Sequence, residues 1–130
     1  MIYLSLAQAL LIAEEVTGIS AGTTTRISRI DLLESALNAP LAGFGEQEFY
    51  PEIFEKAAVL GSRIVRNHPL QDGNKRLSWS MIVIFMDLNG YELVSDEDDA
   101  VDTVLKLAAG ELTEAQFAVW IKEHSTAIQD

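Results

Sequence analysis

Apolar residues recur every three or four positions in six segments of the chain, which is the spacing of one face of an α-helix. In the first segment, Leu6, Leu10 and Ala13 fall on one face, and Gly18 follows the last turn as a stop signal. Proline and glycine punctuate the later segments in a similar way. The pattern therefore predicts helices over residues 5–17, 28–39, 51–67, 75–89, 95–110 and from 113 onward.

Several of these segments open with residues that typically begin a helix. A serine or threonine followed three residues later by an acid or amide can satisfy the first free N–H groups of a helix. Such pairs are Ser28 with Asp31, Ser95 with Asp98, and Thr113 with Gln116. Pro51 suits the first turn of the helix that follows it.

The helix predicted over residues 75–89 is apolar almost all the way round, from Leu77 to Leu88. A helix without a wet face lies at the centre of a domain, and Asn89-Gly90 suits a left-handed cap at its end. No long linker, repeat or low-complexity stretch interrupts the chain. We therefore predict an all-α fold with one domain over residues 1–130, a compact bundle of about six helices around a central buried helix.

Two stretches between the helices lack helical spacing. Residues 22–25 are small and polar, which predicts a loop. Residues 39–50 contain Pro40, Gly43 and Gly45 together with three aromatic residues, Phe44, Phe49 and Tyr50. This composition predicts a flexible loop or a short hairpin.

Composition excludes several classes of function. The net charge of −11, from 9 basic and 20 acidic residues, repels phosphate backbones at long range, so we expect no direct binding of nucleic acid. The chain has no cysteine, which excludes disulfides and thiolate metal sites. No apolar run is long enough to span a membrane, and the N-terminus does not read as a signal peptide. We therefore expect a cytoplasmic protein without a membrane partner.

Residues 68–76 concentrate the candidate chemistry. They lead into the central helix, and the start of a helix favours an anion because its first N–H groups are unpaired. Lys75 and Arg76 add positive charge there, Asp72 can hold a divalent metal, and His68 can accept a proton. These residue types suit the transfer of a phosphate-containing group from a nucleotide.

Two further cations precede this segment. Arg63 and Arg66 either extend the basic cluster around His68 or are solvated charges of their own helix. The other histidine, His124, is expected to lie on the surface without a functional role.

The segment resembles the motif of the Fic/Doc superfamily, H-P-F-x-[D/E]-G-N-G-R-x-x-R. The chain reads His-Pro-Leu-Gln-Asp-Gly-Asn-Lys-Arg over residues 68–76. The likeness is closer to the Doc (death-on-curing) branch, because that branch has lysine where Fic enzymes have the second loop glycine. Residues 31–40, 55–58 and 85–91 are also similar to Doc-family segments and occur in the same order. The resemblance covers almost the full chain and implies the helical Fic/Doc fold.

Three positions depart from the family pattern. Leu70 replaces the usual phenylalanine, and we expect it to anchor the loop in the core with less area buried. Trp79 stands in place of the second Fic arginine, which contacts a phosphate of ATP in Fic adenylyltransferases. Ser80 stands where the Doc branch has asparagine. The loss of the second arginine, with Lys75 in place of glycine, argues against the transfer of AMP.

The resemblance implies a protein Ser/Thr kinase-like phosphoryltransferase that uses ATP and Mg²⁺. His68 is expected to be the general base that takes a proton from a substrate hydroxyl, and Asp72 to bind Mg²⁺. Backbone and side-chain donors would hold the phosphates and stabilise the developing charge. The expected catalytic residues are His68, Asp72, Lys75 and Arg76, and the expected nucleotide-binding residues are Gly73, Asn74, Lys75 and Arg76.

The Doc resemblance also implies partners. A toxin of this branch would modify a translation factor such as elongation factor Tu and arrest translation. The inhibitory pattern [S/T]-x-x-x-E-[G/N] of many Fic proteins does not occur here, so inhibition by a separate Phd-like antitoxin is expected. In the family, the loop that corresponds to residues 41–50 lies beside the active site and holds the target by strand-like pairing. Its aromatic residues here either serve that contact or anchor the core.

Two other functions fit parts of the pattern. A Fic-type AMP- or nucleotidyl-transferase would use the same loop with the nucleotide in the opposite orientation. A catalytically weak binding or regulatory protein would keep the fold, and the substituted positions Leu70 and Trp79 are its support. A labelled γ-phosphate or α-phosphate on the target distinguishes the first two functions.

Overall fold

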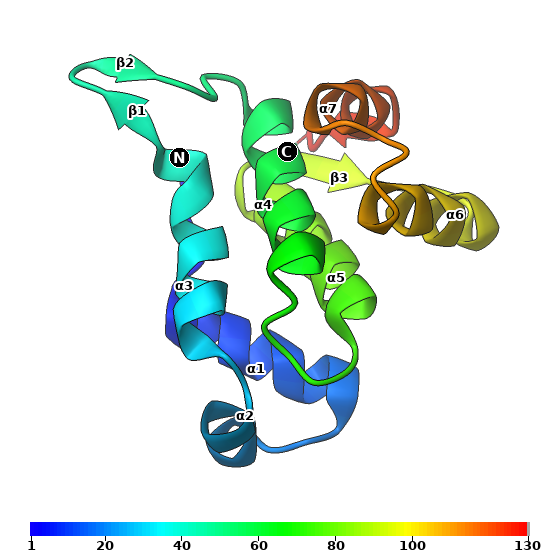
Figure 1. Ribbon diagram of the computed structural model, residues 1–130. Helices are drawn as coiled ribbons and strands as arrows, with labels where there is room; N and C mark the ends of the chain where they lie inside the picture. The colour runs from blue at the N-terminus through cyan, green and yellow to red at the C-terminus, as the bar shows by residue number, and fades with distance from the viewer. Residues whose placement is uncertain (130) are drawn as a thin grey trace.

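The computed structural model describes residues 1–129, and most of them lie in helices (Figure 1). Within these residues the elements follow the order α1 (Leu6–Thr17), α2 (Ala21–Ile27), α3 (Ile30–Asn38), the 3₁₀ turn η1 (Ala39–Leu41), β1 (Gly43–Phe44), β2 (Gln47–Glu48), α4 (Ile53–Asn67), α5 (Asn74–Leu88), β3 (Tyr91–Leu93), α6 (Glu97–Ala108), α7 (Glu114–Glu123) and β4 (Ser125–Ala127). The all-α prediction is confirmed. No helix in this part of the chain has the length and apolar content needed to cross a membrane.

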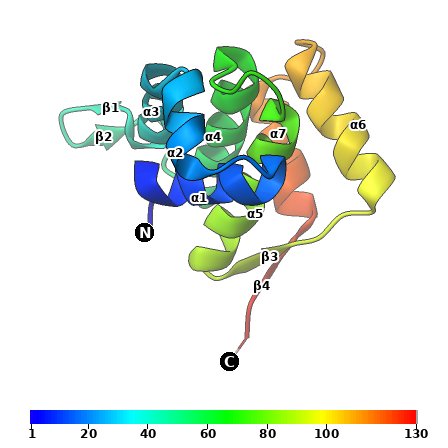
Figure 2. The same cartoon turned by 90° about the horizontal axis from the view of Figure 1, so that it is seen from below.

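Helix α5 is the central helix that its sequence predicts. It packs against α1, α4, α6 and β3, and Figure 2 shows it among these neighbours. Its fully buried side chains are Leu77, Met81, Ile82, Phe85 and Met86. Each contributes about 1.5–3 kcal/mol by its removal from water, so this single helix organises most of the core.

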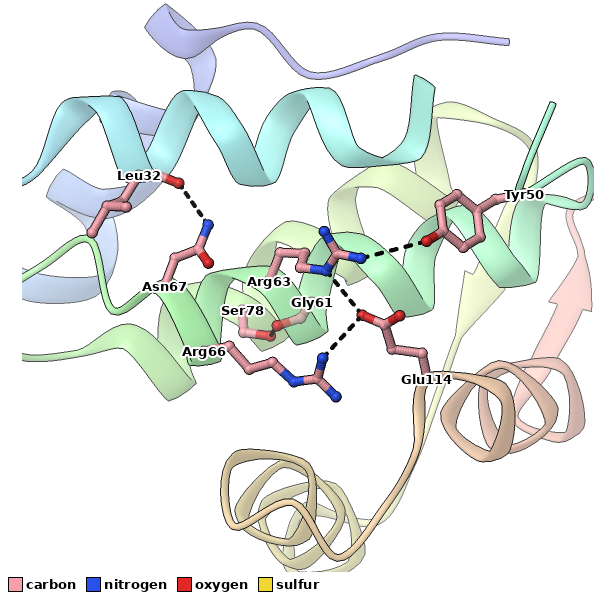
Figure 3. Close-up of polar contacts among 8 residues, drawn as sticks. All are labelled: Leu32, Tyr50, Gly61, Arg63, Arg66, Asn67, Ser78 and Glu114. Atoms are coloured by element: carbon pink, nitrogen blue, oxygen red, sulfur yellow. Dashed lines mark hydrogen bonds and ion pairs between the residues drawn. The ribbon is translucent and has the colours of Figure 1, made fainter. Parts of the chain in front are cut away.

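Three helices meet closely at Gly61 of α4. The Ser78 hydroxyl of α5 donates to the Gly61 carbonyl at 2.8 Å (Figure 3). A Cβ atom at Gly61 would lie 3.0 Å from the Ser78 Oγ, 3.1 Å from the Ile82 Cγ2 and 3.3 Å from the Phe117 Cε2 on α7. The absence of a side chain therefore allows α4 to approach both α5 and α7.

The expected helix starts are confirmed at one pair and wrong at two. Thr113 and Gln116 form a complete capping box at the start of α7. Ser28 instead ends α2, and Arg29 precedes α3 without a side-chain cap. At α6, Asp96 and not Ser95 is the residue that precedes the helix. The Ser95 hydroxyl donates to the Asp96 carbonyl at 2.9 Å. At Ser95, a local hydrogen bond to the backbone thus competes with the capping role.

Asp31 therefore has a different partner from the predicted one. The Arg29 guanidinium donates to the Asp31 carboxylate at 3.3 Å on the protein surface. This hydrogen bond lowers the pKa of Asp31 from its ordinary value.

The loop predicted over residues 22–25 is wrong, because these residues belong to α2. The Ser20 side chain accepts from the Thr23 N–H and caps the helix, and the Thr25 hydroxyl donates to the Ala21 carbonyl at 2.8 Å. Thr24 is buried. Capping and tertiary contact thus override the weak helix propensity of glycine and threonine.

Two small antiparallel pairs complete the fold. Strands β1 and β2 form the short hairpin expected in residues 39–50. Strands β3 and β4 pair Tyr91 with Ala127 and Leu93 with Ser125, and the pattern of apolar residues did not predict them. The hairpin is attached to the core by Lys56 of α4, a buried lysine that donates to the Glu48 carboxylate at 2.9 Å and to the Pro40 carbonyl at 3.2 Å.

Candidate functional site

The candidate site begins where α4 ends, at His68. The backbone of His68 is left-handed, with φ 54°, and its N–H donates to the Ile64 carbonyl at 3.1 Å. Pro69 then prevents continuation of the helix. The imidazole of His68 is exposed at the corner that this turn creates.

The motif loop, which we define as residues 68–73, is held by two buried side chains. Leu70 is 4% exposed and belongs to the hydrophobic core, which confirms that leucine anchors the loop. The Asn74 side chain, 4% exposed, accepts from the Leu70 N–H and donates to the Leu70 carbonyl, both at 2.9 Å. The Arg29 N–H also donates to the Pro69 carbonyl at 2.8 Å. The loop is therefore fixed from both sides.

The role expected for Asn74 changes with this geometry. We predicted that the residue donates to a phosphate, but its side-chain amide is occupied with the backbone of Leu70. What Asn74 can present to an anion is its own backbone N–H in the first turn of α5. Its side chain is part of the scaffold that holds the motif loop.

The start of α5 presents free backbone donors. Gly73, the residue before the helix, has φ 90° and provides no side-chain cap. A Cβ atom at Gly73 would lie 3.2 Å from the Thr17 Cγ2, so glycine serves both the left-handed turn and the contact with α1. The first N–H groups of α5 therefore lack a side-chain acceptor, which is the arrangement that attracts an anion.

Both predicted cations project from this first turn. Lys75 and Arg76 are exposed. The Arg76 guanidinium donates through Nη1 to the Val16 carbonyl at 3.1 Å, at the end of α1. Within residues 1–129, neither Lys75 nor Asp72 forms an ion pair. Their charges are thus available to a ligand.

These residues line one wall of a pocket of about 930 Å³. The size lies in the range of small-molecule sites. The wall formed by the motif loop and α5 brings together the predicted residues His68, Asp72, Gly73, Asn74, Lys75 and Arg76, with Trp79 and Ser80 one turn further along. All six predicted site residues therefore contribute atoms to the lining of one pocket.

The opposite wall was not predicted. It comes from α6 and the residues before it, namely Ser95, Glu97, Ala100, Val101, Val104, Leu105 and Ala108. Val101 and Leu105 are about half exposed, beside the buried Ala100 and Val104. In the sequence, the additional apolar residues Val101 and Leu105 beside the core positions of α6 were the signal for this wall. The sequence does not show which element these residues face.

Arg63 and Arg66 do not belong to this pocket. Both guanidinium groups approach the Glu114 carboxylate at the start of α7, at 3.1 Å and 3.7 Å (Figure 3). Arg63 also lies 3.4 Å from the Tyr50 hydroxyl. Their charges are therefore partly balanced by Glu114, and the basic cluster around His68 reduces to Lys75 and Arg76.

The hairpin of β1 and β2 does not border the site. In Figure 1 it lies at the N-terminal end of α4, whereas the motif loop follows the C-terminal end. Helix α4, which runs between the two, has 15 residues and is about 22 Å long. No residue of 41–50 lines the pocket described above, so the expectation that this segment lies beside the site is wrong in this structure. Phe44 and Phe49 are 83% and 58% exposed, so they are not core anchors either.

His124 is not a simple surface residue. Its ring stacks on Trp120 with centroids 4.0 Å apart, and its Nδ1 lies 2.7 Å from the Trp120 carbonyl. Its Nε2 lies 3.4 Å from the Asp99 carboxylate of α6. The expectation of an exposed histidine is corrected: His124 connects α7 to the helix that forms the second wall of the pocket.

A metal at this site would depend on Asp72. In the part of the chain that the structure describes, no group of three or more His, Cys, Asp or Glu side chains could hold an ion. Mg²⁺ in nucleotide enzymes commonly uses one or two carboxylates, with phosphates and waters as the other ligands. Two carboxylates line the pocket, Asp72 beside the start of α5 and Glu97 on the opposite wall, and neither forms an ion pair within the described residues. This lining fits a metal shared with phosphates better than an all-protein cage.

Comparison with known proteins agrees with this geometry. The Fic/DOC family model matches residues 3–86, which include α1 to α4, the motif loop and most of α5. Toxin Doc of Mycolicibacterium smegmatis is 36% identical over 80 residues. The chain spans 62% of the length of that relative, and the matched part is 62% of this chain. Since the family model covers more than half of the residues, the chain belongs to the Fic/Doc family, and its similarity lies with the Doc branch.

Proposed function

We propose that this chain is a Doc-like toxin that transfers the terminal phosphoryl group of ATP to a hydroxyl of a target protein. By resemblance the target is a translation factor such as elongation factor Tu, so that the reaction arrests translation. One observation carries the proposal: an exposed imidazole, a free carboxylate, two cations and an uncapped helix start share one wall of a single pocket.

His68 would act as the general base. Its imidazole is exposed at the pocket and is held at a rigid turn. The ring nitrogen takes the proton of the target hydroxyl, and the hydroxyl oxygen forms a bond to the terminal phosphorus of ATP. The bond from this phosphorus to the bridging oxygen breaks, and ADP leaves. A positioned base of this kind typically contributes about 10²–10⁴-fold to the rate.

The first turn of α5 would hold the transferred group. Its backbone N–H groups, including those of Asn74 and Lys75, point toward the pocket end of the helix. The side chains of Lys75 and Arg76 add two positive charges. Donors fixed before the reaction stabilise charge on the equatorial phosphoryl oxygens without reorganisation.

Asp72 would hold Mg²⁺ at the phosphates. The residue has the hard oxygen donor that this ion prefers, and its carboxylate is free within the described residues. When bound, the ion neutralises phosphate charge. Asp72→Asn is therefore expected to remove most of the Mg²⁺ dependence of ATP binding in calorimetric titrations, whereas full retention of that dependence would assign Asp72 a structural role.

The rival reaction, transfer of AMP, has less support. Trp79 offers no charge to bind a second phosphate, and Lys75, in the first turn of α5, places a long side chain where Fic enzymes have glycine. The pose with the terminal phosphate at the helix start needs neither feature.

A labelling experiment decides between the two reactions. Purified protein is incubated with candidate translation factors and with ATP labelled at the γ- or the α-phosphate. We expect only the γ-label on the target, and a mass increase of about 80 Da, that of one phosphoryl group. His68→Ala is the inactive control. A gain of a whole nucleotide monophosphate would overturn the proposal in favour of AMP transfer, and no modification would favour a binding protein.

We also propose a Phd-like antitoxin as partner. The support is the similarity to a protein named Toxin Doc. Co-expression of a small reading frame that lies next to this gene in its genome should relieve growth arrest and yield a complex with the chain. Arrest that persists with every neighbouring frame would argue against a toxin–antitoxin pair.

A further inference from the structure

The pocket has two chemically different halves. The half around the motif loop is charged, as described above. The other half lies between Trp79 of α5 and the apolar side of α6, where Val101, Val104 and Leu105 face the same space. Trp79 follows Asn74 by five residues, so it lies about 7 Å further along the helix axis. The aromatic wall therefore begins where the anion site ends.

Trp79 is held in place from behind. Its ring meets Trp120 of α7 edge to face, with centroids 5.9 Å apart. Trp120 in turn stacks on Phe117 and His124, and His124 contacts Asp99 of α6. These aromatic side chains connect the three helices around this half of the pocket. Trp79 is only partly buried, so one part of its indole stays accessible from the pocket.

We propose that Trp79 is a specificity-determining residue that stacks on the base of the nucleotide, in the slot between its indole and the apolar face of α6. The inference rests on the proposed function, because it names how the same pocket holds the nucleotide beyond its phosphates. The flat base of a nucleotide fits between the aromatic wall of Trp79 and the aliphatic wall of α6. The phosphates that are joined to the base fit the cationic end of the slot at the start of α5.

Stacking on an indole depends on ring overlap rather than on hydrogen-bond pattern. A purine covers more of the indole than a pyrimidine does. The slot therefore favours ATP and GTP over CTP and UTP, and the residue at position 79 controls base affinity separately from phosphate affinity.

The chain contains two tryptophans, which allows a direct test. In Trp120→Phe the ring contact behind Trp79 is kept and Trp79 is the single fluorescent indole. Titration of this variant with Mg²⁺ and ATP should quench the emission saturably. Inorganic tripolyphosphate, which lacks a base, should bind in calorimetry without this quenching, and CTP should bind more weakly than ATP.

Substitutions of Trp79 separate stacking from packing. Trp79→Leu keeps an apolar side chain and removes the ring, so it should weaken ATP binding by about 5- to 100-fold and leave tripolyphosphate affinity unchanged. Trp79→Phe retains a ring and should recover most of the ATP affinity. If Trp79→Leu lowers the melting temperature strongly, the quenching experiment on Trp120→Phe still decides the assignment.

Three results would overturn the inference. Equal quenching by ATP and tripolyphosphate would show that the indole does not sense the base. Equal affinity of wild type and Trp79→Leu for ATP, or equal weakening for ATP and tripolyphosphate, would show that position 79 does not discriminate. If wild type binds neither ATP nor tripolyphosphate, the proposed function fails together with this inference. If wild type binds both compounds and Trp79 has no effect on either affinity, this inference fails and the proposed function stands.

Discussion

The side chains of the motif divide into those that hold the loop and those that face the pocket. Leu70 and the side chain of Asn74 are buried and make the loop rigid. His68, Asp72 and Lys75 are exposed at the pocket. Changes in the first group should lower stability, and changes in the second should lower activity with the fold intact.

His68→Ala tests the second group. Because the imidazole is exposed and assigned to proton transfer, we expect phosphoryl transfer to fall by about 10²–10⁴-fold. ATP affinity, measured by calorimetry, should stay close to that of wild type, since the donors proposed to hold the phosphates belong to α5. A large loss of ATP affinity would instead place His68 in nucleotide binding.

Asn74→Ala tests the first group. The substitution removes two hydrogen bonds and leaves the buried N–H and carbonyl of Leu70 without partners, so unfolding in urea should require about 2–4 kcal/mol less free energy. Asn67→Ala is a matched control, because its amide makes one bond, to the Leu32 carbonyl at 3.1 Å (Figure 3), and should cost about 1 kcal/mol. Equal costs would show that the motif loop does not depend on Asn74.

At the scale of the elements, the periodicity of the sequence predicted the long helices well and the local detail poorly. Helices α1 and α5 follow from apolar spacing and from glycine stops at their ends. Helix α2 was missed because its stability comes from the Ser20 cap and a buried threonine rather than from propensity. The pair β3–β4 joins segments more than thirty residues apart, and no local pattern reports such pairing.

The candidate site shows the same limit. The residues of the motif loop are adjacent in the sequence, so their shared wall could be predicted from residues 68–76 alone. The second wall depends on how α6 packs against α4 and α5, and on single contacts such as that of His124, at the end of α7, with Asp99. The position of the hairpin relative to the site likewise follows from the direction of α4 and not from its sequence.

Gly61 and Gly22 provide a matched pair for helix packing. Gly61→Ala introduces a methyl group 3.0 Å from the Ser78 Oγ and 3.1 Å from the Ile82 Cγ2, and overpacking of this kind costs about 1–3 kcal/mol. Gly22 lies in α2, and a methyl group added there would have no neighbour within 4 Å, so Gly22→Ala should stabilise by up to about 1 kcal/mol through helix propensity. Urea unfolding measures both, and a Gly61→Ala variant as stable as wild type or more stable would contradict the close packing of α4.

At the scale of the whole molecule, the charge distribution is strongly unbalanced. The net charge is −11, and the ion pairs of the described residues join mostly exposed partners, such as Lys106 with Asp102. Exposed pairs contribute about 0–1 kcal/mol each. Repulsion among the excess carboxylates therefore outweighs the pairs, and the positive start of α5 is a local exception on an acidic surface.

Added salt should consequently stabilise the protein. An increase from about 0.01 M to about 0.1 M NaCl shortens the screening length from about 30 Å to about 10 Å. Salt therefore weakens the repulsion between distant carboxylates more than it weakens the attraction within close ion pairs. We expect the melting temperature to rise by about 2–5 °C. KCl should act equally if the effect is screening, and a fall in melting temperature would show that attractive pairs dominate.

The left-handed backbone of His68, with φ 54°, makes the activity of this chain easy to lose by mutation while its shape persists. Glycine adopts that conformation without the steric cost that other residues incur, so His68→Gly should fold with a free energy of unfolding equal to that of wild type or up to about 1 kcal/mol higher. Under the proposed function, cells that survive expression of this chain would therefore carry silenced copies that remain folded and still bind the proposed antitoxin. Sequencing of such survivors should show substitutions at His68 enriched over substitutions at core positions such as Leu77, and enrichment in the core would contradict this view.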